Sequence, residues 1–163
     1  MRAMGDLNEE KLLELSEIVN TIEKFYASDG NKYVMFEPGF AGQSVCHAHI
    51  HFLPGDFLIT EAISCIEPPI TELRTITEIE DFYKKNGRYF LWKQKSKILV
   101  CGLKGRTVQS SYFRSLIAGQ LMTSAVINWK DYGLHHGLRE KAKFQISELL
   151  KKWQKMEWNN DLE

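Results

Sequence analysis

Three of the five histidines in this chain occupy alternate positions, at His47, His49 and His51. Small or apolar residues fill the positions between them. Successive side chains of a β-strand point to opposite faces, so a strand would place all three imidazoles on one face. A helix would turn residues two apart to roughly opposite sides, and the rings could not converge. We therefore expect a strand over 47–53.

The other face of that strand is expected to be buried. Its side chains are small or apolar: Cys46, Ala48, Ile50 and Phe52. If that face packs into the core, replacing Ile50 by Ala should cost about 2–5 kcal/mol of stability. Pro54 and Gly55 end the run.

A row of imidazoles has three interpretations. Neutral imidazole attacks phosphorus well, and flanking rings can hold phosphate oxygens. Two of the rings could instead bind zinc. However, a strand rises about 3.3 Å per residue, so the outer rings are anchored about 13 Å apart and suit one ion poorly. We therefore expect no structural metal; a third ligand would have to come from Glu37, Asp56, His135 or His136. The third interpretation is a histidine face without chemistry.

The residues before the histidines favour phosphate binding. Gly42 allows a close backbone approach, and Gln43 and Ser44 are neutral groups that can hold phosphate oxygens. With this lead-in, the run His47-Ala48-His49-Ile50-His51-Phe52-Leu53 resembles the histidine triad (HIT) superfamily. That family's signature is His-φ-His-φ-His-φ-φ, where φ is apolar, and the run fits at every position.

The resemblance implies a role for each residue of the motif. His49 would attack an α-phosphate and form a nucleotidyl-histidine, while His47 and His51 orient and stabilise the phosphate and the leaving group. Gln43 and Ser44 would contact phosphate oxygens. The resemblance also implies an α+β fold with an antiparallel sheet and flanking helices, a homodimer, and a substrate in which a nucleoside phosphate is joined to a second group.

Two features depart from the family pattern. Family members carry small strands and a helix before the helix that precedes the motif, and these build much of the nucleoside pocket. This chain begins almost at that helix, so the pocket is either missing or supplied by later residues or by a partner chain. Many members also place an amide near the position of Phe36, and a phenyl ring cannot hydrogen-bond phosphate.

The composition limits the class of protein. With 163 residues, 44% of them hydrophobic, the chain can bury the core of one domain. Equal numbers of basic and acidic residues, 21 of each, argue against a broad nucleic-acid or membrane surface. The three scattered cysteines, Cys46, Cys65 and Cys101, make no disulfide framework. We expect reduced thiols in a cytoplasmic protein with no signal peptide and no membrane span.

Periodicity and turn residues predict the remaining elements. We expect one HIT-like domain over 1–163, with the core motif in 7–56 and additional strands and helices in 57–157. The expected helices are 7–27, 75–85, one within 109–121, and 138–157; the expected strands are 33–36, 47–53, 88–93 and 97–101, with 57–71 extended.

The C-terminal half holds further candidates for binding. Arg106 and Arg114 could clamp phosphate, or could be solvated or paired with acids. Tyr89 and Leu91 should face one side of their strand and Phe90 and Trp92 the other, as core or as a platform for a base.

The leading hypothesis is a HIT-type hydrolase or nucleotidyl transferase that acts at the α-phosphate of a nucleoside phosphate conjugate or a dinucleoside polyphosphate. The alternative is a catalytically inactive nucleotide-binding or interaction module. We expect no tightly bound cofactor, with Mg²⁺ arriving, if at all, alongside a nucleotide substrate.

Overall fold

The computed structural model describes most of the chain: residues 1–28, 30, 32–41, 47–64, 69–106, 108–109, 112–120 and 136–160, with only the backbone for 61, 64, 114, 136, 138 and 157–160. The chain divides into two compact units, Met1–Met122 and Thr123–Glu163. The single HIT-like domain expected over 1–163 stays a prediction.

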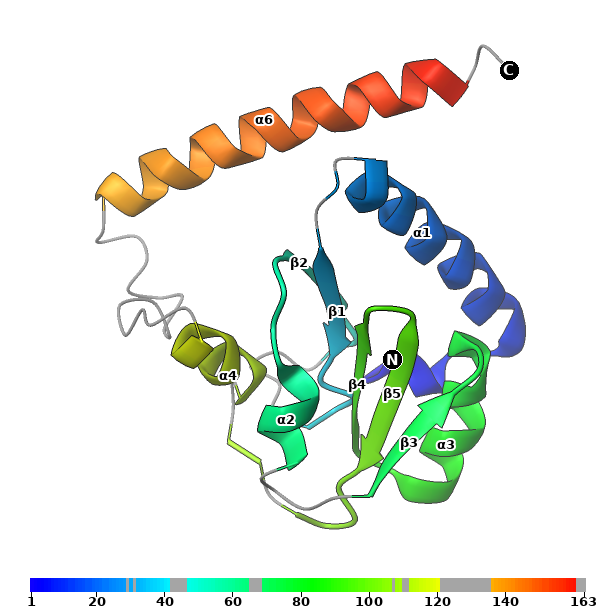
Figure 1. The fold of residues 1–163 in the computed structure, drawn as a ribbon. Coiled ribbons are helices and arrows are strands. Elements are labelled where there is room, and N and C mark those ends of the chain that lie inside the picture. Colours follow the sequence, from blue (N-terminus) through cyan, green and yellow to red (C-terminus); the bar gives the residue numbers. More distant parts are fainter. Residues whose placement is uncertain are drawn as a thin grey trace. The chain divides into compact units, whose positions relative to one another are not determined.

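The first unit is an α+β fold (Figure 1). Its helical elements are η1 (Met4–Asp6), α1 (Glu9–Ser28), α2 (Ile59–Ser64), η2 (Ile76–Glu78), α3 (Ile79–Asn86) and α4 (Tyr112–Gln120). Its strands are β1 (Tyr33–Glu37), β2 (His51–Pro54), β3 (Ile70–Leu73), β4 (Tyr89–Gln94) and β5 (Lys97–Gly102). The expected α+β class with an antiparallel sheet and flanking helices is therefore confirmed.

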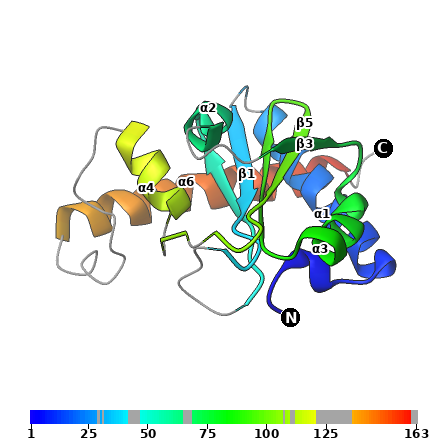
Figure 2. The same ribbon diagram turned by 90° about the horizontal axis from the view of Figure 1, so that it is seen from below.

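Within the described residues, the five strands form one sheet in the order β2-β1-β4-β5-β3, and every neighbouring pair is antiparallel. Helices α2 and α4 lie on one side of the sheet, and α1 and α3 lie on the other (Figures 1 and 2). Strand β2, which begins with the last histidine, is at one edge. Strand β3 is at the other edge, which agrees with the prolines before it.

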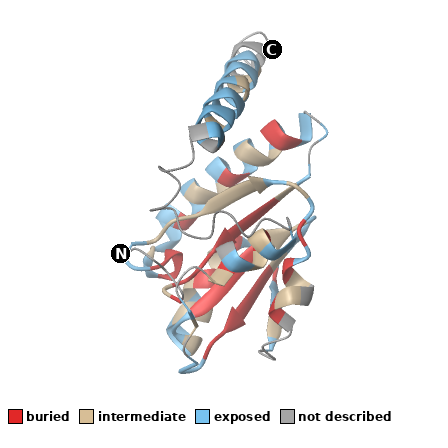
Figure 3. Ribbon diagram, turned by 90° about the vertical axis from the view of Figure 1, so that its left-hand side faces the viewer, coloured by how far each residue is buried: buried red, intermediate tan, exposed pale blue. Residues whose placement is uncertain are grey.

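Alternating side chains of the central strands divide into two cores, so that β1, β4 and β5 are buried on both faces (Figure 3). The core under α2 and α4 takes Val34, Phe36, Phe90, Trp92, Leu99 and Cys101 from the sheet. The core under α1, η1 and α3 takes Met35, Tyr89, Leu91 and Val100. The expected division of β4 is confirmed, and its aromatic rings are core.

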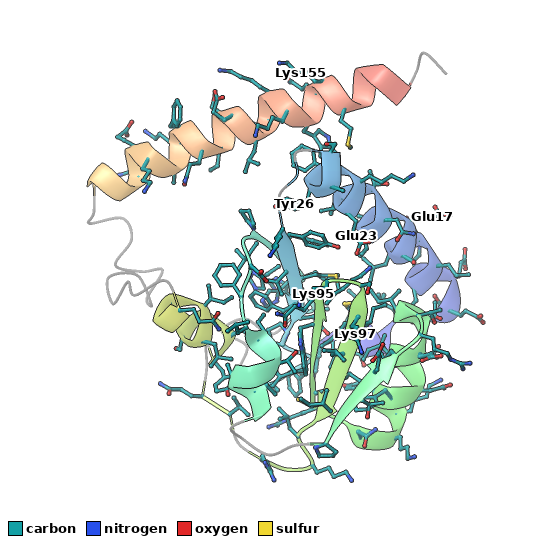
Figure 4. The ribbon with its side chains drawn as sticks, viewed as in Figure 1. Glu17, Glu23, Tyr26, Lys95, Lys97 and Lys155 are labelled. Atoms are coloured by element: carbon teal, nitrogen blue, oxygen red, sulfur yellow. The ribbon has the colours of Figure 1, made fainter. Side chains whose placement is uncertain are left out.

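Helix α1 is held to the sheet by apolar contacts and one shielded ion pair. Leu12 and Val19, seven residues apart on one face of the helix, are buried in the core below it. Glu23 pairs with Lys93 of β4, and Tyr26 stacks on Tyr33 of β1 with ring centroids 5.1 Å apart. Figure 4 draws Glu23 and Tyr26 on the side of α1 that faces the sheet.

The N-terminal turn η1 is pinned on the same core by two buried hydrogen bonds. The Met4 N–H donates to Glu37 Oε1 at 3.0 Å, and the Gly5 N–H donates to the Tyr89 hydroxyl at 3.1 Å. A Cβ on Gly5 would lie 2.3 Å from Tyr83 Cβ, so only glycine fits this close approach. Glu37 is fully buried, and its Oε2 has no hydrogen-bond partner among the residues that the structure describes.

Two sequence expectations for the middle of the chain are wrong. The segment 57–71 contains helix α2, in which Ile59 and Ile63, four residues apart, are both fully buried. The face of Ala48, Ile50 and Phe52 is half-buried rather than buried. These residues lie at or next to an edge strand, so sheet neighbours cover them from one side only. Cys46 lies outside the described residues.

The half-burial of Ile50 lowers the expected cost of its removal. Ile79 of α3 is fully buried and provides a matched isoleucine. We expect Ile79→Ala to cost about 2–5 kcal/mol of unfolding free energy and Ile50→Ala less than about 2 kcal/mol. Urea unfolding of both variants checks this through their midpoints. Equal losses of unfolding free energy in the two variants would show that Ile50 is packed as tightly as Ile79.

The second unit contains α6 (His136–Asn160). No residue of α6 whose burial is described is buried, and four large apolar side chains are exposed: Phe144, Ile146, Leu149 and Leu150. None of the helices in the described part of the chain combines the length and the apolar character needed to cross a membrane.

Candidate functional site

The three histidine rings of the motif form a continuous row. The ring centroids of His47 and His49 are 5.5 Å apart, and those of His49 and His51 are 4.8 Å apart, each pair in an edge-to-face arrangement. The expected convergence of the rings is therefore present. The expected strand over 47–53 is wrong in its first part, because β2 starts only at His51 and residues 47–50 approach it without strand pairing.

A backbone contact fixes the tautomer of His49. Its Nδ1 lies 2.9 Å from the carbonyl oxygen of His47. A carbonyl oxygen only accepts hydrogen bonds, so Nδ1 must carry the proton that this bond uses. In the neutral ring the lone pair then belongs to Nε2, at the opposite side of the imidazole. This contact lies in the part of the motif that precedes β2 and is not paired in the sheet.

His51 is held by the sheet and by an aromatic neighbour. It pairs with Phe36 across the β1–β2 ladder, and the two rings stack with centroids 4.6 Å apart and planes 18° apart. Phe36 also stacks on Phe113 of α4, at 4.6 Å and 22°. Phe36 and Phe113 are each 3% exposed, so the ring of His51 packs against the edge of the buried core. His47, in contrast, is exposed to solvent.

A tight turn leads from β1 towards the histidines. Gly39 and Phe40 both have left-handed backbone conformations, with φ of 51° and 63°, and the Ala41 N–H donates to the Pro38 carbonyl at 2.7 Å. A Cβ on Gly39 would lie 2.4 Å from the backbone oxygen of Tyr89, so this position requires glycine. The turn immediately precedes in sequence the expected phosphate-contacting lead-in, Gly42-Gln43-Ser44-Val45, which lies outside the described residues.

The other expected phosphate-binding residues are only partly placed. Gln43 and Ser44 lie outside the described residues, as does the side chain of Arg114 on α4. Arg106 follows β5 in a turn where its N–H donates to the Leu103 carbonyl at 2.7 Å. The charge of Arg106 acts on the Cys101 thiol, but burial dominates and raises the pKa of Cys101 to about 11. Cys101 is thus a core thiol rather than a nucleophile.

The structure also places two of the candidate third ligands for a metal. Glu37 is buried on the opposite face of the sheet from the ring of Phe36, where it accepts from Met4. Asp56 is paired with Lys32 at 2.5 Å. His135 and the side chain of His136 lie outside the described residues. In the part of the chain that the structure describes, no group of three or more side chains is arranged to hold a metal ion.

A small cavity lies further along the β1–β2 pair. Its volume is about 170 Å³, below the roughly 300–1,000 Å³ of typical small-molecule sites. It is lined by Tyr33, Val34, Phe57, Lys32, Asp56 and Lys95, among others. Tyr33 pairs with Pro54, three residues beyond the Phe36–His51 pair. The cavity is therefore separated along the strands from the histidine row.

Sequence reasoning missed the contact of Phe36 with His51. The alternation of β1 puts Val34 and Phe36 on one face, but only the register of β2 shows that His51 lies opposite Phe36. Comparisons of the chain with protein-family models, with curated proteins and with solved structures find no match. The resemblance to the HIT superfamily therefore stays a prediction from the motif.

Proposed function

We propose that this protein is a nucleotide hydrolase or nucleotidyl transferase that acts at an α-phosphate through a covalent bond to His49. The observation that carries the proposal is the Nδ1 contact of His49 with the His47 carbonyl. It leaves Nε2 as the nucleophilic atom and holds the ring in one orientation. The resemblance of the motif to the HIT superfamily supports the same assignment.

The mechanism is two displacements at phosphorus. In the first, the Nε2 lone pair of His49 forms a bond to the α-phosphorus, the bond from phosphorus to the leaving group breaks, and the leaving group keeps that electron pair and takes a proton from solvent. In the second, water or another acceptor attacks the phosphorus, loses a proton, and the phosphorus–nitrogen bond returns its electron pair to Nε2. His47 and His51, on either side of His49, stabilise the phosphate oxygens, with Gln43 and Ser44 as further partners.

A panel of substrates tests this proposal. The protein is incubated with nucleoside phosphoramidates and with dinucleoside polyphosphates, and release of nucleoside monophosphate is measured. We expect turnover of at least one class, which would also define the leaving group. If calorimetry shows that the protein binds nucleotide but no substrate of the panel is turned over, the proposed catalytic function is contradicted.

A specific observation favours the second candidate, an inactive nucleotide-binding module. Phe36 stacks on His51 at the place where the resemblance implies a phosphate-contacting amide. A phenyl ring offers phosphate no hydrogen bond. The module would bind nucleotide without turnover, so the same panel separates the two functions.

We also propose that the chain forms a homodimer. The resemblance implies it, and α6 supports it, because its exposed apolar side chains would be stabilised by packing on another surface. Sedimentation at micromolar concentration should show a dimer, and Leu149→Glu with Leu150→Glu should weaken it. A monomer at all concentrations would refute the proposal.

A further inference from the structure

The ring of Phe36 provides an orienting contact for His51 that the motif itself does not supply. The two residues are directly paired in the antiparallel ladder, and their rings are nearly parallel with centroids 4.6 Å apart. This separation and angle are those of an offset aromatic stack. Rotation of the His51 ring out of its plane would break the stack.

Helix α4 fixes the position of Phe36. Phe113 stacks on Phe36 at 4.6 Å and meets Phe90 of β4 edge to face at 4.8 Å. Phe90 in turn stacks on Tyr112 at 5.3 Å. All three phenylalanines are at most 3% exposed, so close packing allows their rings little freedom.

The orientation of the His51 ring in turn affects the ring of His49, at the centre of the histidine row. Its ring meets that of His49 edge to face, with planes at 80° and centroids 4.8 Å apart. His49 is therefore held by the His47 carbonyl at Nδ1 and bounded by the His51 ring. A hydrogen-bonding side chain in place of Phe36 could orient an imidazole by its polar atoms; here the orienting contact is apolar.

We propose that Phe36 is a positioning residue, which acts through His51 and is itself set by Phe113 of α4. The kinetic part of this inference rests on the proposed function, whereas the orientation of His51 does not. Loss of the ring should misplace the group that stabilises the phosphate. Misplacement by about 1 Å costs up to about 10²-fold in rate.

The test compares Phe36→Leu with Phe90→Leu. Both remove a buried ring that contacts Phe113, but only Phe36 stacks on His51. The first readout is the NMR shift of the His51 ring protons in the nucleotide-free protein. We expect Phe36→Leu to move these signals and Phe90→Leu to leave them in place, because only the first removes the ring current. Unmoved His51 signals in Phe36→Leu would overturn the inference, whether or not the protein is an enzyme.

The second readout is turnover, corrected for the folded fraction of each variant. We expect kcat to fall about 10- to 100-fold in Phe36→Leu with little change in KM, and to fall much less in Phe90→Leu. Phe36→Tyr, which keeps the ring, should recover most of the loss. Equal losses in the two leucine variants would mean that Phe36 acts only through stability, and would overturn the inference. If the wild-type protein shows no turnover, the proposed function is refuted. The NMR shifts of His51 alone then test whether Phe36 is a positioning residue.

Discussion

His49→Ala should eliminate turnover. No other single substitution in the histidine row should lower the rate as much. The residue supplies the bonding electron pair in the proposed mechanism, so its loss removes the two-step route. A residue that only donates a hydrogen bond to developing charge contributes about 10²–10³-fold. We therefore expect Ser44→Ala to slow turnover within that range. Steady-state rates with the best substrate of the panel give the comparison.

The control for His49→Ala is His47→Ala. His47 contributes its backbone carbonyl to the contact with His49 Nδ1, and alanine keeps that carbonyl. The variant should therefore keep the orientation of His49 and lose only the stabilising ring, with a loss of about 10²–10³-fold. Wild-type rates in His49→Ala, or a larger loss in His47→Ala than in His49→Ala, would refute the role of His49.

Glu37→Gln should remove a large pH dependence of stability. Burial raises the pKa of Glu37 to about 7, against a partial lowering by the Tyr89 hydroxyl and the N–H groups of Met4 and Gly39. The nearby carboxylate of Asp6 raises the pKa further. Because the folded state binds this proton more tightly than the unfolded chain, stability is greatest below the unfolded value of 4.5 and falls as pH rises through about 7.

The expected size of this effect is about 3 kcal/mol, the energy that corresponds to the difference between the two pKa values. Glutamine keeps an oxygen that accepts from the Met4 N–H but has no proton to lose. Urea unfolding of both proteins from pH 4 to pH 9 measures the effect. Subtracting one curve of unfolding free energy against pH from the other cancels the contribution of other titrating groups. The unfolding free energy of the variant should exceed that of the wild type increasingly towards high pH. Parallel curves would show that Glu37 titrates as an exposed carboxylate.

The α+β class, which the resemblance of the motif implied, is the class that the structure has. The apolar run Tyr89-Phe90-Leu91-Trp92 predicted a strand with Tyr89 and Leu91 on one face and Phe90 and Trp92 on the other, as core or as a platform for a base, and both faces prove to be core. Alternation failed for α2, because Phe57-Leu58-Ile59 resembles a short strand. The signal for a helix there was the spacing of four between Ile59 and Ile63.

The row of histidine rings was predictable from the sequence, but the details of its geometry were not. Alternate histidines predicted converging rings, and the rings of His47, His49 and His51 do form a row. The sequence could not show that strand pairing begins only at His51. It also could not place Phe36 beside His51, because strand register depends on pairing partners distant in the chain.

Capture of the covalent intermediate tests the central claim most directly. Wild-type protein is mixed with a nucleotide substrate labelled on the α-phosphate, quenched within milliseconds under conditions that preserve phosphorus–nitrogen bonds, digested, and mapped by mass spectrometry. We expect one nucleotidyl group, attached to His49, and no label in His49→Ala. Label on any other residue, or turnover of a good substrate without a captured adduct on His49, would contradict the mechanism.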